Sequence, residues 1–78
     1  MRDTILEILT DIRPDIDFEN EKALIDEGLL ESFDIVTLVS ELSSEFDISI
    51  KPKELVAENF NSVDAIVKMV ERLSELIY

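Results

Sequence analysis

The 78-residue sequence contains no cysteine and no histidine. Disulfide bonds, thiolate nucleophiles, zinc sites of the Cys/His type and acid–base catalysis by histidine are therefore excluded. No apolar run approaches the ~20 residues that a membrane-spanning helix needs, and no signal peptide opens the chain. We therefore expect a cytoplasmic protein without membrane insertion.

Basic residues are also scarce. Seven lysines and arginines stand against nineteen acidic residues, which gives a net charge of −12. Binding to nucleic acid or to an anionic membrane depends on basic side chains, so we expect neither as a partner. The charge instead favours a partner with a basic surface. A hydrophobic fraction of 46% suffices for folding, and residues 1–78 are expected to form one small domain.

Apolar residues recur at the spacing of a helix face in three segments. The first helix should end near Arg13, because Pro14 disfavours helical geometry in the residue before it. The second helix extends from about residue 32 to residue 46, and Asn61 or Ser62 caps the last one. A short helix fits between residues 54 and 59. The sequence thus predicts an all-α fold, a small four-helix bundle of three main helices plus a short third helix.

Each main helix has a predicted inward face. Its residues are Ile5, Ile8, Leu9 and Ile12 in the first helix, Ile35, Leu38, Val39, Leu42 and Phe46 in the second, and Val63, Ile66, Val67, Val70, Leu73 and Ile77 in the last.

A long loop connects the first two helices. Residues 15–31 exceed the usual connection of ~4–6 residues, and long loops in compact domains are often functional. Gly28, the single glycine, is expected to supply a turn conformation that other residues adopt at a cost. Six apolar residues could pin the loop to the core: Ile16, Phe18, Leu24, Ile25, Leu29 and Leu30.

Ser32 stands where this loop meets the second helix. A serine in that place is typical of a helix N-cap, whose side-chain oxygen accepts one of the unpaired helical N–H groups. It is not equipped as an enzyme nucleophile, because the chain has no histidine and no lysine between Lys22 and Lys51 to act as its base.

Carboxylates are the other candidates for chemistry. We expect the acidic residues on solvent faces or in loops, where they would keep ordinary pKa values, so no catalytic pair is predicted. The acidic segments also lack the ligand spacing of a calcium loop. The sequence therefore predicts no catalytic residue and no metal site.

Four segments in order resemble the acyl carrier protein family. They are residues 26–33, 45–48, 48–50 and 60–66, so the resemblance covers most of the chain. The first of them reads Asp26-x-Gly28-Leu29-x-Glu31-Ser32-Phe33. The chain departs from the family at the core motif, where Glu31 replaces the usual aspartate and Phe33 the usual leucine.

The resemblance implies that Ser32 carries a covalent 4′-phosphopantetheine arm. A phosphopantetheinyl transferase would attach the arm, and a ligase or synthase would load acyl or aminoacyl groups onto its thiol as thioesters. The protein would be a substrate and no enzyme, and we expect a monomer. The phosphate would lie at the helix N-terminus, opposed by the charges of Glu31 and Asp34.

The second helix indicates which kind of carrier this is. Thr37, Ser40, Ser43 and Ser44 stand where fatty-acid carriers have acidic or bulky apolar residues. The Gly-Leu-Leu-Glu-Ser segment is more similar to free-standing carriers for D-alanine or for secondary-metabolite acyl and aminoacyl groups. We therefore expect a carrier dedicated to one biosynthetic pathway.

The resemblance also implies a partner-binding surface around Ser32. Its residues are Glu31, Phe33, Asp34, Val36, Ser40 and Glu41. From spacing alone, Val36 could equally be a partly buried rim of the core. A second interpretation also stays open, in which the protein is an unmodified helical interaction module and Ser32 is only a helix cap.

The charge leads to a prediction about stability. A net charge of −12 on a small body should limit stability through self-repulsion. Raising the salt concentration from about 10 mM to about 150 mM should therefore raise the melting temperature by screening. Thermal denaturation followed by circular dichroism tests this, and a melting temperature indifferent to salt would contradict it.

Overall fold

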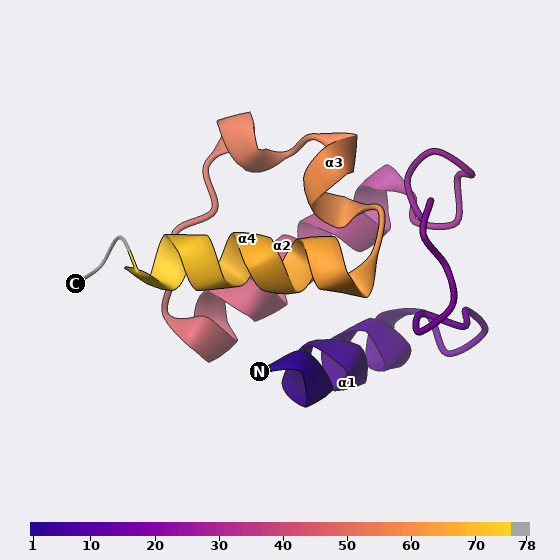
Figure 1. Ribbon diagram of the computed structural model, residues 1–78, viewed down its shortest axis with the longest axis horizontal. Helices are drawn as coiled ribbons and strands as arrows, with labels where there is room; N and C mark the ends of the chain where they lie inside the picture. The colour runs from indigo at the N-terminus through magenta and orange to yellow at the C-terminus, as the bar shows by residue number, and fades with distance from the viewer. Residues whose placement is uncertain (76–78) are drawn as a thin grey trace.

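The computed structural model describes residues 1–75 and is built from helices (Figure 1). They are α1 (Arg2–Ile12), α2 (Ser32–Phe46), a 3₁₀ turn (Pro52–Glu54), α3 (Ala57–Phe60) and α4 (Val63–Glu75). No strand occurs within that described part of the chain. The predicted four-helix arrangement with a short third helix is confirmed, and α2 has the predicted bounds.

The helices pack around one core. Helix α1 lies against α2 and α4, and α4 also contacts α2 and the short α3. The buried apolar side chains come from every helix and from the connecting segments; they are Ile5, Leu9, Phe18, Leu24, Leu30, Leu38, Leu42, Ile48, Phe60, Val63, Ile66, Met69, Val70 and Leu73. The helical spacing in the sequence therefore identified the inward faces, except at Ile77, which lies outside the described residues.

The loop between α1 and α2 is held at both its middle and its end. Phe18, Leu24 and Leu30 are buried in the core, and the other three predicted apolar residues are partly buried. Asn61, at the junction of α3 and α4, accepts the N–H of Leu24 on its carbonyl oxygen at 2.9 Å. Its side-chain oxygen accepts the N–H of Ile25 at 2.9 Å. In Figure 1 this loop therefore lies against one end of the bundle.

The structure confirms two predictions about local conformation, one at a turn and one at a helix start. Gly28 has a φ of +71°, a conformation that costs other residues about 1–2 kcal/mol. Ser62 directly precedes α4, and its Oγ accepts the N–H of Ala65 at 3.1 Å, which makes Ser62 the cap of that helix.

The expectation that all acidic side chains lie on solvent faces or in loops is wrong for two residues. Asp34 is only 9% exposed and Glu54 only 7%. Each is paired with an arginine distant in sequence, Asp34 with Arg13 at 3.1 Å and Glu54 with Arg72 at 2.5 Å. These pairings supply the hydrogen bonds that a buried carboxylate needs, and helical spacing does not reveal them.

The Glu54 pair makes stability depend on pH. Hydrogen bonds from Arg72 hold the pKa of Glu54 below its usual value, against the opposing effect of burial. The folded state therefore binds this proton less tightly than the unfolded chain does. The stabilisation is complete above the unfolded pKa of about 4.3 and is lost as the pH falls through the lower folded value.

Glu54→Gln should accordingly lower the melting temperature at about pH 7, and the difference from wild type should shrink towards about pH 3. Melting curves across that range check the prediction. Glu58→Gln, a change at an exposed glutamate, serves as the control and should behave like wild type. A wild-type-to-variant difference that stays constant with pH would show that Glu54 acts by packing alone.

Candidate functional site at the start of helix α2

Ser32 is exposed and is the first residue of α2. The prediction that it caps this helix is wrong, because Glu31 occupies the N-cap position with extended backbone angles (φ −97°, ψ 170°). The Asp34 carboxylate reaches back from the first turn, and its Oδ2 accepts the N–H of Glu31 at 3.1 Å. The backbone of the helix start is thus fixed by the neighbours of Ser32.

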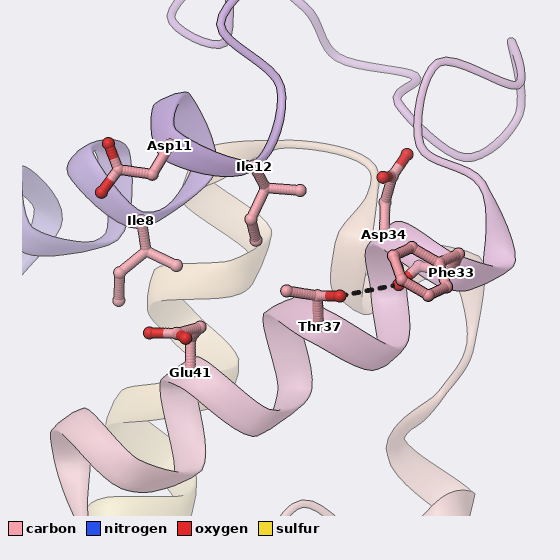
Figure 2. Close-up of a pocket in the computed structure, with 7 residues that line it drawn as sticks. All are labelled: Ile8, Asp11, Ile12, Phe33, Asp34, Thr37 and Glu41. Carbon is pink, nitrogen blue, oxygen red and sulfur yellow. Dashed lines mark hydrogen bonds between the residues drawn. The ribbon is translucent and has the colours of Figure 1, made fainter.

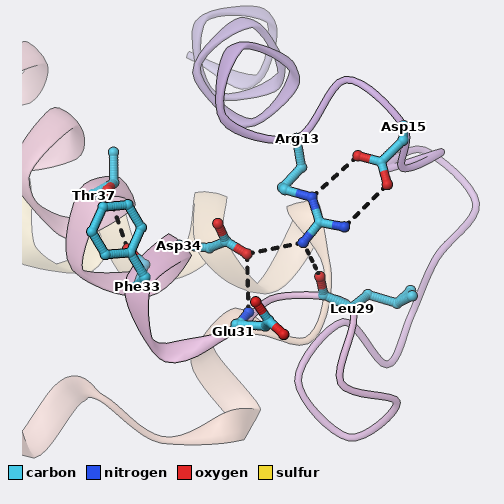
Figure 3. Close-up of polar contacts among 7 residues, drawn as sticks. All are labelled: Arg13, Asp15, Leu29, Glu31, Phe33, Asp34 and Thr37. Carbon is cyan, nitrogen blue, oxygen red and sulfur yellow. Dashed lines mark hydrogen bonds and ion pairs between the residues drawn. The ribbon is translucent and has the colours of Figure 1, made fainter.

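A guanidinium group ties this helix start to the end of α1 (Figure 3). Nη1 of Arg13 donates to the carbonyl oxygen of Leu29 at 3.0 Å and to Oδ2 of Asp34 at 3.1 Å. Nε and Nη2 donate to the two carboxylate oxygens of Asp15 at 3.1 and 3.0 Å. One side chain therefore holds the loop's last residues and the first turn of α2 together.

The charges in this cluster stabilise one another. The hydrogen bonds that Arg13 donates to Asp15, and then to Asp34, raise the pKa of Arg13 above its usual value. The Arg13 guanidinium in turn holds the pKa of Asp15 below its usual range. Arg13 and Asp15 therefore both stay ionised at neutral pH. The Asp34 charge that was expected to oppose a phosphate at Ser32 is compensated by Arg13.

Most of the predicted partner-binding residues lie on the exposed side of α2. Phe33 is 80% exposed and Val36 is 68% exposed, so Val36 is not a rim of the core. Glu31, Ser40 and Glu41 are exposed as well. Asp34 differs from the rest because its carboxylate is buried against Arg13. Two of the five large apolar side chains that are exposed in the described part of the chain thus stand within one turn of Ser32.

An open groove of about 330 Å³ separates this exposed side of α2 from α1 (Figure 2). Thr37 lies in its wall, where its hydroxyl donates to the carbonyl oxygen of Phe33 at 3.1 Å. The lining residues are Ile8, Asp11 and Ile12 of α1 and Phe33, Asp34, Thr37 and Glu41 of α2. Ser32 is not among them, so the groove borders the serine's neighbours and leaves the serine itself facing solvent.

The residues near Ser32 do not assemble a catalytic centre. The nearest buried carboxylate, Asp34, is occupied by Arg13 and by the N–H of Glu31. Within residues 1–75 no cluster of potential metal ligands is found. The arrangement offers an exposed hydroxyl at the N-terminus of a 15-residue helix, where N–H groups favour an anion. These features fit attachment of a phosphate-linked group by another protein.

Sequence reasoning missed Arg13 as part of this site. It is the single basic residue between Arg2 and Lys22, and it directly follows α1 as the C-cap residue of that helix. A lone arginine in so acidic a segment is a weak signal of a buried carboxylate partner, but no spacing rule connects it with residue 34.

Comparison with known proteins agrees with this geometry. The model of the family described as "Phosphopantetheine attachment site" matches residues 2–70. The chain belongs to this family. Its members carry covalent 4′-phosphopantetheine on a serine, so the predicted family and cofactor are confirmed. The interpretation as an unmodified interaction module is not favoured.

Several relatives in the family are similar along almost the whole chain. The D-alanyl carrier protein of Lactococcus lactis subsp. cremoris (strain MG1363) is 31% identical over 81 residues, covering 96% of this chain and 98% of the relative. The D-alanyl carrier protein of Streptococcus suis (strain 05ZYH33) is 31% identical over 74 residues and 94% of each chain.

A third relative has a different name. Aminoacyl carrier protein 1 of Bradyrhizobium diazoefficiens is 39% identical over 54 residues, which is 69% of this chain and 59% of the relative. The family works with phosphopantetheinyl transferases and ligases. Among the described residues, no helix is long and apolar enough to cross a membrane.

Proposed function

We propose that this phosphopantetheine-bearing carrier holds its arm on Ser32 and transports an aminoacyl group, such as D-alanine, for one dedicated pathway. The observation that supports the attachment site is the exposed Ser32 at the start of α2, directly after backbone groups of Leu29 and Glu31 that Arg13 and Asp34 hold by hydrogen bonds. The other serine at a helix start, Ser62, uses its oxygen to cap α4.

The chemistry of attachment needs an external catalyst. Ser32 Oγ attacks the phosphorus next to pantetheine in coenzyme A, a phosphodiester forms, and adenosine 3′,5′-bisphosphate leaves. The transferase supplies the base for the serine proton, because the one buried carboxylate nearby is bound to Arg13. The N-terminus of α2 favours the phosphodiester. Once attached, the arm provides a thiol that holds acyl groups as thioesters.

The cargo is inferred from two sources. The first source is the names of similar proteins, which include D-alanyl and aminoacyl carriers. The second source is the resemblance: α2 has Thr37, Ser40 and Ser44 at positions where the resemblance implies acidic or bulky apolar residues for a fatty-acid carrier. We therefore rank an amino acid first as cargo, and a secondary-metabolite acyl group second.

The remaining predictions belong to the same proposal. Residues 1–78 would act as one carrier domain, monomeric and cytoplasmic, without catalytic activity of its own. Its partners would be a phosphopantetheinyl transferase and an acyl- or aminoacyl-loading ligase or synthase.

The surface proposed for these partners surrounds Ser32. Phe33 and Val36 provide its apolar centre, and Glu31 and Glu41 place negative charges beside it, with Ser40 further along the helix. An apolar centre with an acidic rim fits a partner that has an apolar pocket bordered by basic residues. We omit Asp34 from the surface because its carboxylate is buried.

Ser32→Ala should abolish arm attachment without unfolding the protein. Since Glu31 is the N-cap, the change should alter the free energy of unfolding by only about 0.5 kcal/mol or less. Intact mass after incubation with coenzyme A and a broad-specificity transferase, together with urea denaturation, measures both effects. Ser44→Ala, at an exposed serine of the same helix, should be modified like wild type. A Ser32→Ala variant that still gains the arm would disprove the site.

Val36→Asp should slow arm attachment or loading while keeping the fold. Because Val36 is 68% exposed, stability should change by less than about 1 kcal/mol. The new charge would lie unpaired in the docking interface and raise KM for the carrier. Lys68→Gln changes the net charge equally at an exposed residue of α4 and is the control. If the Val36 variant is folded and processed at the control's rate, partners bind another face.

A further inference from the structure

We propose that Arg13 is a positioning residue for arm attachment, holding the Leu29 carbonyl before Ser32 and the Asp34 side chain after it so that the serine has the orientation that the transferase requires. This inference rests on the proposed function, in which Ser32 accepts the arm. It assigns a role to a side chain that lies outside the predicted partner surface and does not itself touch the reacting atoms.

The contacts of Arg13 enclose the serine. Leu29, whose carbonyl oxygen accepts from Nη1, lies three residues before Ser32, and Asp34, which accepts from the same nitrogen, lies two residues after it. Asp34 also accepts the N–H of Glu31. Two backbone groups before Ser32, the carbonyl of Leu29 and the N–H of Glu31, and the side chain of Asp34 after it are therefore held in place, while Ser32 itself remains exposed for the partner.

Arg13 is itself anchored to the scaffold. Its backbone N–H donates to the carbonyl oxygen of Leu9 at 2.9 Å, which continues the hydrogen bonding of α1 by one residue. Asp15 holds the other edge of the guanidinium through two hydrogen bonds. Figure 3 shows the guanidinium between Asp15 on one side and Leu29 and Asp34 on the other, so Arg13 links the end of α1 to the start of α2.

Only arginine can make this set of contacts. Three nitrogens in a rigid plane donate in two directions, towards Asp15 on one side and towards Leu29 and Asp34 on the other. The single ammonium nitrogen of lysine keeps the charge but cannot span both sides. Charge and geometry can therefore be separated by comparing Arg13→Lys with Arg13→Gln.

A purely structural role is the competing explanation, because losing Arg13 leaves the buried Asp34 charge without its partner. The double variant Arg13→Gln/Asp34→Asn removes that charge and should regain melting temperature relative to Arg13→Gln. If positioning is the role, the double variant still lacks the arginine contacts, so attachment should stay slow although the fold has recovered.

The kinetic constants distinguish the positioning role from a purely structural role in a second way. Among the described residues, Arg13 makes no hydrogen bond to the exposed docking residues Phe33 and Val36. The transferase should therefore still bind the carrier when Arg13 is changed. A displaced serine would instead reduce the rate within the complex, since errors of about 1 Å can lower rates by as much as about a hundredfold. The effect should appear in kcat, with KM nearly unchanged.

The experiment measures kcat and KM of a phosphopantetheinyl transferase, with coenzyme A as donor and each carrier variant as acceptor, below the melting temperature of the least stable variant. Arg13→Gln and Arg13→Lys should lose about tenfold or more in kcat, with KM within about twofold. Arg72→Gln is the matched control, because it removes the other arginine paired with a buried carboxylate. Its kcat should stay within about twofold of wild type.

Two results would overturn the positioning role while leaving the proposed function intact. One is an Arg13→Gln variant as fast as Arg72→Gln; the other is a double variant that recovers kcat along with melting temperature. Ser32→Ala in the same assay defines the background. If that variant is modified, the proposed attachment site fails, and the positioning role fails with it.

Discussion

The ion pair between Arg13 and the buried Asp34 is the contact on which the geometry of the site depends. Helices α1 and α2 are joined by a long loop, and a loop of that length does not by itself determine where the next helix starts. Buried apolar residues and Asn61 hold the middle of the loop, and Arg13 holds its end. The result is an exposed Ser32 on a fixed backbone, as a modification site requires.

The same pairing changes how the strong negative charge acts. With a net charge of −12, most of the surface repels anions, yet Asp34 and Glu54, the carboxylates that are buried among the described residues, are each matched by an arginine. Near Ser32 this leaves Glu31 as the acidic neighbour whose charge stays exposed. The surface can therefore attract a basic partner over a distance while opposing a phosphate at the proposed site, Ser32, less than the sequence suggests.

Much of the fold could be predicted because its determinants are local. Apolar spacing identified the helices, Pro14 marked the end of α1, and Gly28 marked a turn. The wrong predictions concern which single residue caps a helix and which residues distant in sequence pair with each other. Spacing could not decide whether Ser32 or the residue before it caps α2, since assigned helix ends shift by about one residue. The burial of Asp34 depends on an arginine 21 residues away, and no local pattern reports such a pair.

The central claim is that the arm is attached to Ser32 and to no other residue. Trypsin should release residues 23–53 of the modified wild-type protein as one peptide, because no lysine or arginine lies between Lys22 and Lys51, and Pro52 hinders cleavage after Lys51. Fragmentation of that peptide by tandem mass spectrometry locates the added mass. All of the added mass should be located on Ser32. Phosphopantetheine on any other serine, inside or outside this peptide, would contradict this assignment.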